Sequence, residues 1–138
     1  MNDLIRTLTE AYGPSGFEDE VRDLIRPLVE PLADEISVDA MGNLIAHKRA
    51  KGGKPNPLKV MVAAHMDEIG IMASHITEKG FLRFTNIGGV FPNTLLAGRV
   101  RFANGTIGVI GSDQLDDMSS IHPLNKHFID VGATSRED

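Results

Sequence analysis

His65 and Asp67 are the residues whose types and spacing best suit metal chemistry. A neutral imidazole is a good ligand for zinc or cobalt, and a neighbouring carboxylate fixes its tautomer and raises its basicity. In an extended segment, side chains two positions apart point the same way, so the Asp67 carboxylate can reach the His65 ring. The spacing alone fits such a site, and it equally fits a histidine that is hydrogen-bonded at a strand end beside exposed acids.

The residues on either side of His65 must position it. Residues 58–64 (Leu-Lys-Val-Met-Val-Ala-Ala) are almost continuously apolar, which is typical of a strand buried on both faces of an α/β sheet. Because ligands bind beyond the carboxyl ends of strands in open α/β sheets, His65 is expected at the functional edge. Gly70 then lets the backbone bend away without steric cost. This context favours the metal site over the bare hydrogen-bonded histidine.

Two amphipathic helices are predicted at the start of the chain. The first carries an apolar stripe over residues 4–11 and ends at the turn Gly13-Pro14-Ser15-Gly16. Ser15 with Glu18 three residues later is a capping-box pattern, which predicts the start of the second helix. Pro27 predicts a kink in that helix, or its end near Arg26. The buried face of the second helix is expected to consist of Val21, Leu24, Ile25, Leu28 and Val29.

The type of periodicity changes after His65. Before it, a hairpin over residues 35–39 and 44–47 and a solvated loop over 49–57 complete the helical part. After it, helical periodicity disappears and short strands follow one another. We therefore predict two parts, residues 1–68 and residues 69–138.

The second part is predicted to be a small antiparallel β unit, barrel-like in form. Asn104-Gly105 is a strong hairpin signal within it. Residues 111–127 are polar and irregular, and Ser135 with the acids that follow resembles a helix start. The expected strands are residues 69–77, 81–86, 96–102, 106–110 and 128–131.

Composition excludes several classes of protein. The 138 residues carry 14 basic and 19 acidic side chains, a net charge of −5, which argues against a nucleic-acid binder because phosphate neutralisation needs a basic face. No apolar run is long enough to span a bilayer, so a membrane protein is not expected. Cysteine is absent, which removes disulfides and thiolate ligands and fits a cytoplasmic protein.

The other polar candidates have simpler interpretations. His47 is expected at the surface beside two basic residues, and His75 is expected to face solvent across a β ladder. His122 and His127 flank Pro123 in the polar loop, where they could hold a metal only adventitiously. Asp113, Asp116 and Asp117 form an acidic cluster that is expected to be a solvated loop, because the spacing of a calcium loop is absent. Asp130 lies in a predicted strand, where a structural role is expected.

Several ordered motifs resemble the M42 family of metallo-aminopeptidases, the glutamyl and deblocking aminopeptidases related to the tetrahedral peptidases. The most specific motif is Ala64-His65-Met66-Asp67-Glu68-Ile69-Gly70. Further motifs match in order over essentially the whole chain: Gly13-Pro14-Ser15-Gly16-Phe17-Glu18, Asp39-Ala40-Met41-Gly42-Asn43-Leu44, Ile87-Gly88-Gly89, Gly108-Val109-Ile110-Gly111 and Phe128-Ile129-Asp130-Val131-Gly132-Ala133.

The resemblance implies an α/β fold: the N-terminal part of a metallopeptidase α/β sandwich, followed by a small β-rich dimerisation domain inserted after the histidine motif. Members remove N-terminal residues from peptides with two divalent metals, zinc or cobalt. The residue matching His65 is a metal ligand, and the one matching Asp67 supports catalysis by orienting it. Residues 69–138 would be most of the inserted domain, through which dimers build a tetrahedral dodecamer.

The resemblance also implies what this chain lacks. Members are well over twice as long, and their other metal ligands and glutamate general base follow the inserted domain. One histidine with one supporting aspartate cannot hold two metals, so we expect a fragment that is inactive alone. The alternative is a non-catalytic oligomerisation module, whose interface would use Val90-Phe91-Pro92 and Leu95-Leu96.

Overall fold

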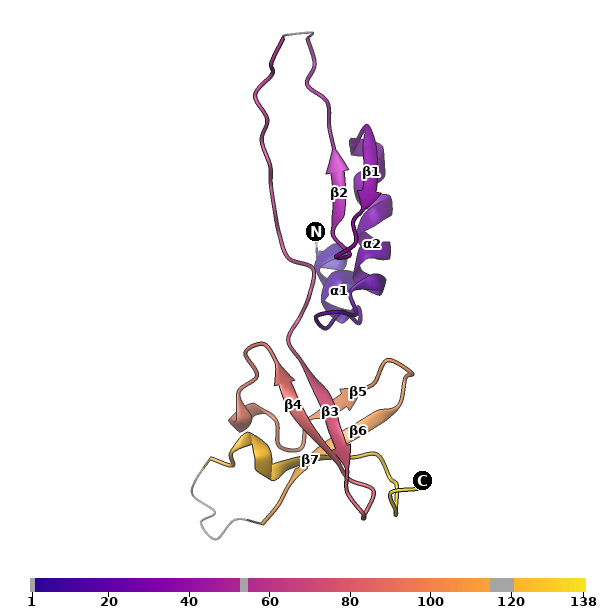
Figure 1. Ribbon diagram of the computed structural model, residues 1–138, viewed down its shortest axis with the longest axis vertical. Coiled ribbons are helices and arrows are strands. Elements are labelled where there is room, and N and C mark those ends of the chain that lie inside the picture. The colour runs from indigo at the N-terminus through magenta and orange to yellow at the C-terminus, as the bar shows by residue number, and fades with distance from the viewer. Residues whose placement is uncertain (1, 53–54, 115–120) are drawn as a thin grey trace. The chain divides into compact units, whose positions relative to one another are not determined.

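The computed structural model describes residues 2–52, 55–114 and 121–138. The chain divides into two compact units, Met1–Glu68 and Ile69–Asp138, and each is described by itself. The first contains two helices and a hairpin, and the second contains one five-stranded sheet (Figure 1). Within the described ranges, no helix is long and apolar enough to cross a bilayer.

The two predicted helices are present in the first unit as α1 (Asn2–Glu10) and α2 (Asp19–Val29). Pro27 predicted a kink in α2 or its end near Arg26, and the predicted end is wrong. The helix continues through Pro27 to Val29 and passes into the 3-10 turn η1 (Glu30–Leu32). The predicted buried face is also incomplete. Only Val21 of α2 is buried, and Leu28 is half exposed, since little of the described first unit packs against this face.

The predicted hairpin is confirmed as β1 (Glu35–Val38) paired antiparallel with β2 (Leu44–His47). Its turn is held by Asp39, whose carboxylate accepts hydrogen bonds from the backbone N–H groups of Met41 and Asn43, each at 2.9 Å. These bonds favour the ionised carboxylate, so the pKa of Asp39 lies below its usual value, with the side-chain amide of Asn43 as the largest cause.

The prediction that residues 58–64 form a strand buried on both faces is wrong for this structure. The segment is extended but pairs with no other strand of the described residues, and Val62 is 92% exposed (Figure 1). An apolar strand becomes buried only when neighbouring strands and helices cover it, and the described part of the first unit supplies none. The segment is therefore an extended apolar stretch with unpaired backbone groups.

The second unit is a single antiparallel sheet in the order β3-β4-β7-β6-β5. Its strands are β3 (Gly70–Ile76), β4 (Leu82–Ile87), β5 (Arg99–Arg101), β6 (Ile107–Ser112) and β7 (His127–Asp130). Two further 3-10 turns connect them: η2 (Pro92–Thr94) and η3 (Leu124–Lys126).

The sheet curls, as the barrel-like prediction requires, but its pairings leave β3 and β5 as edges. β4 meets β7 at one register position, Leu82 with Ile129, so the β3–β4 ribbon crosses the other three strands (Figure 1). A bulge between Ala73 and His75 adds to the bend. The core lies inside the curl and consists of Phe84, Leu95, Ile110 and Ile129.

Turn chemistry explains much of this topology. The predicted hairpin at Asn104-Gly105 is confirmed: Gly105 has φ +86°, and Phe102 N–H donates to the Thr106 carbonyl at 2.9 Å. Residues 135–138 form no complete helical turn, but the Asp138 carboxylate accepts hydrogen bonds from the backbone N–H groups of Thr134 and Ser135. A carboxylate three residues after a capping serine makes this bond in a capping box, so the contact agrees with the predicted helix start.

Candidate metal-binding segment around His65

The backbone after residue 64 is clamped by the turn that follows α1. Glu68 N–H donates to the Gly13 carbonyl at 2.8 Å, and Pro14 and Glu68 form an isolated parallel bridge. Within the turn, Phe17 N–H donates to the Pro14 carbonyl at 2.8 Å, and Gly16 takes the positive φ of +87° that such a turn requires. Two segments about fifty positions apart are therefore fixed against each other inside the first unit.

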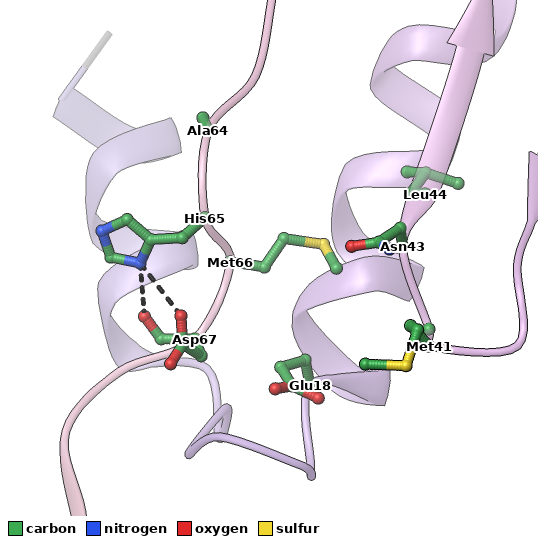
Figure 2. A pocket seen from close by; sticks show the side chains of 9 residues that line it. Glu18, Met41, Asn43, Leu44, Ala64, His65, Met66 and Asp67 are labelled. Atoms are coloured by element: carbon green, nitrogen blue, oxygen red, sulfur yellow. Dashed lines mark hydrogen bonds and ion pairs between the residues drawn. The ribbon is translucent and has the colours of Figure 1, made fainter. Parts of the chain in front are cut away.

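His65 and Asp67 lie on the same side of this segment, as their spacing predicts. His65 Nδ1 lies 3.1 Å from Asp67 Oδ1 and 3.0 Å from the Asp67 carbonyl oxygen, whereas Met66 points to the opposite side (Figure 2). Both partners of Nδ1 are acceptors, so Nδ1 carries the proton. The lone pair of a neutral ring is then on Nε2, which forms no hydrogen bond with the described residues.

The other oxygen of the Asp67 carboxylate is also bonded. The Ser15 hydroxyl donates a hydrogen bond to Asp67 Oδ2. Hydrogen bonds to a carboxylate favour its charged form, so the pKa of Asp67 lies below the ordinary value, first because of Ser15 and then because of His65. The prediction that Ser15 caps α2 in a capping box is wrong: α2 has no side-chain cap, and Glu18 instead accepts a hydrogen bond from Gly16 N–H.

A small pocket of about 180 Å³ adjoins this segment. The hairpin turn and Glu18, the residue before α2, form its other walls, and Figure 2 shows Met66 extending toward Asn43 and Met41. Its lining residues are Glu18, Met41, Gly42, Asn43, Leu44, Ala64, His65, Met66 and Asp67.

The donor set of the segment fits one position of a metal site. An imidazole with Nδ1 donating to a carboxylate and Nε2 facing outward is the arrangement of metal-ligating histidines. The His65 side chain is 86% exposed, so Nε2 is accessible. Within the described residues, however, no three His, Cys, Asp or Glu side chains gather where they could share an ion. The segment can supply one ligand, and a complete centre needs others.

The other histidines and acids lie elsewhere. His47 and His75 are exposed, as expected. Asp130 accepts a hydrogen bond from Gly132 N–H at 2.8 Å, which is a structural role. Asp116 and Asp117 lie outside the described residues.

His127 and Asp113 have structural roles that the sequence did not reveal. His127 is 1% exposed, and its Nδ1 lies 3.1 Å from the Pro123 carbonyl oxygen. His122 hydrogen-bonds the Ser112 hydroxyl. Asp113 is not merely solvated: both its oxygens accept from Arg83 Nη2 at 2.9 Å, which lowers the pKa of this carboxyl. These residues fasten the irregular segment to the sheet, and no periodicity in the sequence indicates such contacts.

Comparison with known proteins decides the family. Residues 42–138 match the family model of the M42 glutamyl aminopeptidases. The chain belongs to the M42 peptidase family. M42 aminopeptidases are metal-dependent enzymes. The relatives that match this sequence are hydrolases with aminopeptidase names.

Three relatives show the extent of the similarity. A protein of Acetivibrio thermocellus with an aminopeptidase name is 46% identical, over 100% of this chain and 40% of its own length. An aminopeptidase of the archaeon Desulfurococcus kamchatkensis superposes with a TM-score of 0.85 at 42% identity, over 98% of this chain and 38% of that one. The Pyrococcus horikoshii TET1 peptidase, which can assemble into a tetrahedron or a large octahedral shell, gives a TM-score of 0.81 at 33% identity. The match covers 99% of this chain and 42% of that one.

The M42 chain thus spans about 40% of the length of the curated relatives it matches. Its mixed helical and β architecture with a curled sheet is that of the TET aminopeptidases over this span. The motif that predicted the family, around His65, lies within the matched residues.

Proposed function

We propose that this chain supplies the first metal ligand of a two-metal aminopeptidase that removes N-terminal residues from peptides. His65 is the ligand, through Nε2, and Asp67 orients it. The observation that carries the proposal is the Nδ1 contact of His65 with Asp67 Oδ1 at 3.1 Å, which leaves Nε2 outward and accessible. Family membership supports the aminopeptidase activity, and the histidine chemistry supports zinc or cobalt as the metals.

The chain's own residues contribute binding and orientation to the reaction. Two divalent ions, when bound, supply Lewis acidity toward the peptide carbonyl and lower the pKa of water. His65 donates a hydrogen bond from Nδ1–H to Asp67, which fixes the ring plane and keeps the Nε2 lone pair available. Asp67 stays ionised through the neutral range, because its pKa lies below the usual value of a carboxyl group.

We propose that the chain alone does not hydrolyse peptides. The described residues bring together one histidine and its supporting aspartate, without a third neighbouring ligand. A two-metal centre needs several carboxylates and histidines as well as a general base. In this proposal the first unit belongs to the catalytic α/β sandwich, and the missing groups come from sequence that lies outside these 138 residues.

The second unit is proposed as most of an inserted dimerisation domain, from which the whole enzyme builds a tetrahedral dodecamer. It carries an open apolar pocket of about 250 Å³ beside β3, and Phe91 at its rim is 69% exposed. A relative assembles into a tetrahedron. A non-catalytic oligomerisation module remains the alternative, and this same exposed pocket favours it. The absence of cysteine supports a cytoplasmic location for either function.

A chimera tests the proposed activity. This chain replaces the part of the Desulfurococcus aminopeptidase to which it aligns, and release of the N-terminal residue from short peptides is measured with zinc or cobalt present. The chimera should be active, and His65→Ala and Asp67→Asn should each reduce its turnover at least 100-fold, whereas the surface control His47→Ala should not. The chain by itself should show no hydrolysis. Robust hydrolysis by the chain alone, lost on Asp67→Asn, would refute the need for further ligands.

A further inference from the structure

We propose that Ser15 is a positioning residue for His65. Its hydroxyl holds the Asp67 carboxylate in the orientation that keeps the proton of the His65 ring on Nδ1 and the lone pair on Nε2. The inference rests on the proposed role of His65 as a metal ligand. It adds to that proposal a residue 50 positions away in the sequence, located on the turn after α1.

The two oxygens of Asp67 have different partners, and this difference makes the hydroxyl important. Oδ2 accepts from the Ser15 hydroxyl, and Oδ1 lies 3.1 Å from His65 Nδ1. A carboxylate bonded at both oxygens cannot rotate without breaking one bond. The Asp67 side chain is 38% exposed, so without Ser15 water would compete for both oxygens and the carboxylate could turn away from the ring.

Ser15 is itself fixed by the backbone around it. The Pro14–Glu68 bridge and the bond from Glu68 N–H to the Gly13 carbonyl join its turn to the segment that contains Asp67. The hydroxyl therefore starts from a backbone position that is constrained relative to the carboxylate. Such support from outside the ligand shell is how proteins hold a metal-binding side chain in its productive geometry.

The contact with Asp67 is not a by-product of helix capping. α2 begins at Asp19 without a side-chain cap, and Glu18 accepts from Gly16 N–H at 2.6 Å. Removing the Ser15 hydroxyl therefore does not remove a cap from α2. The Asp67 carbonyl oxygen also lies 3.0 Å from His65 Nδ1, so loss of the hydroxyl should weaken the preference for the Nδ1-protonated ring rather than abolish it.

The ring tautomer of His65 provides the direct test. Chains labelled with ¹⁵N-histidine are studied by NMR well above the ordinary histidine pKa of about 6.5, where the ring is neutral. Ser15→Ala is compared with Ser15→Thr, which retains the hydroxyl, and with Ser37→Ala, a matched control on the exposed strand β1. Asp67→Asn shows the change expected when the carboxylate is lost. Backbone amide spectra verify that each variant keeps the fold of the first unit.

We expect the Nδ1-protonated ring to dominate in the unaltered chain. Ser15→Ala should shift the His65 signals part of the way toward those of Asp67→Asn, and Ser15→Thr and Ser37→Ala should leave them unchanged. If Ser15→Ala leaves the His65 signals where they were, or if Ser15→Thr shifts them as far as Ser15→Ala does, the positioning role is overturned.

A zinc titration separates this inference from the proposed function. Zn²⁺ alone is added to each chain, and the His65 ring signals report binding. Ser15→Ala should weaken the apparent affinity severalfold, less than the 10- to 100-fold loss typical when a direct partner of a ligand is removed. An unchanged affinity would contradict the positioning role. If Zn²⁺ leaves His65 unaffected in the unaltered chain, the ligand role of His65 fails, and the tautomer comparison still decides whether Ser15 acts on His65 through Asp67.

Discussion

Arg83 should be the most important charged residue for the stability of the second unit. It extends from β4 to the segment that returns to β7. Its guanidinium donates to both oxygens of Asp113 at 2.9 Å and to the His127 carbonyl at 3.1 Å, and its Cζ lies 5.8 Å from the centre of the Phe128 ring. We therefore expect Arg83→Ala to destabilise the sheet more than removal of Asp113 alone.

The magnitude follows from exposure and the number of partners. The Arg83 and Asp113 side chains are 25% and 36% exposed, so the ion pair contributes about 1 kcal/mol. The bond to the His127 carbonyl adds about 1 kcal/mol, and the contact with the Phe128 ring adds about 0.5 kcal/mol. Arg83→Ala should therefore cost about 2–3 kcal/mol of unfolding free energy, and Asp113→Asn about 1 kcal/mol, because the carbonyl and ring contacts remain.

The assay must report the second unit alone, since the chain has two compact units and a single unfolding curve would mix them. Urea unfolding is followed through amide NMR signals of β6 and β7. The double variant Arg83→Ala, Asp113→Asn should cost no more than Arg83→Ala by itself, because its ion pair is already absent. If Asp113→Asn costs as much as Arg83→Ala, or if neither costs more than about 0.5 kcal/mol, the reasoning is refuted.

The same pair predicts a dependence on pH. Arg83 lowers the pKa of Asp113 in the folded state below its ordinary value of 3.8. The stabilisation is therefore complete above about pH 4 and is lost as pH falls from there through the lower folded pKa. Stability of the second unit should decline less steeply with acid in Asp113→Asn than in the unaltered chain. An identical acid dependence in both would contradict this assignment.

Two further predictions concern close packing and the extended apolar segment at residues 58–64. Gly108→Ala should destabilise the second unit by about 2 kcal/mol, because an added Cβ would lie 2.3 Å from Cγ2 of the buried Ile129. Gly89 has open space around it, so the control Gly89→Ala should change the urea midpoint little. Equal effects of the two substitutions would show that the contact with Ile129 does not limit packing. Val60→Lys with Val62→Lys should reduce self-association in sedimentation velocity at high concentration and cost less than about 0.5 kcal/mol, since both side chains are largely exposed. A large loss of stability there would show that residues 58–64 are packed in solution.

Local patterns in the sequence predicted most of the elements. Helical periodicity located α1 and α2, and alternation with turn residues located the β1–β2 hairpin and the β5–β6 connection at Asn104-Gly105. Each of these depends on residues close together in the chain. The error at the end of α2 has a local cause as well, because Pro27 is accommodated within the helix.

The other failures involve contacts between distant residues or missing neighbours. The apolar pattern of residues 58–64 describes a strand that needs partners, and the described first unit provides none. The Ser15–Asp67 bond and the Arg83–Asp113 pair join positions 52 and 30 residues apart. Ser15 matches a local capping pattern, and that pattern gives no indication of its distant partner Asp67. For the site, the sequence identified His65 and Asp67 as neighbours, but could not identify the residue that holds Asp67.

The claim that His65 ligates a metal ion in an M42 aminopeptidase is tested by the metal content of the protein. The chimera with the Desulfurococcus enzyme is purified, dialysed against trace zinc or cobalt, and analysed for bound metal per chain by atomic emission. The proposed function predicts two ions in the chimera and in His47→Ala, and at least one fewer in His65→Ala. Two tightly bound ions in His65→Ala would contradict the claim.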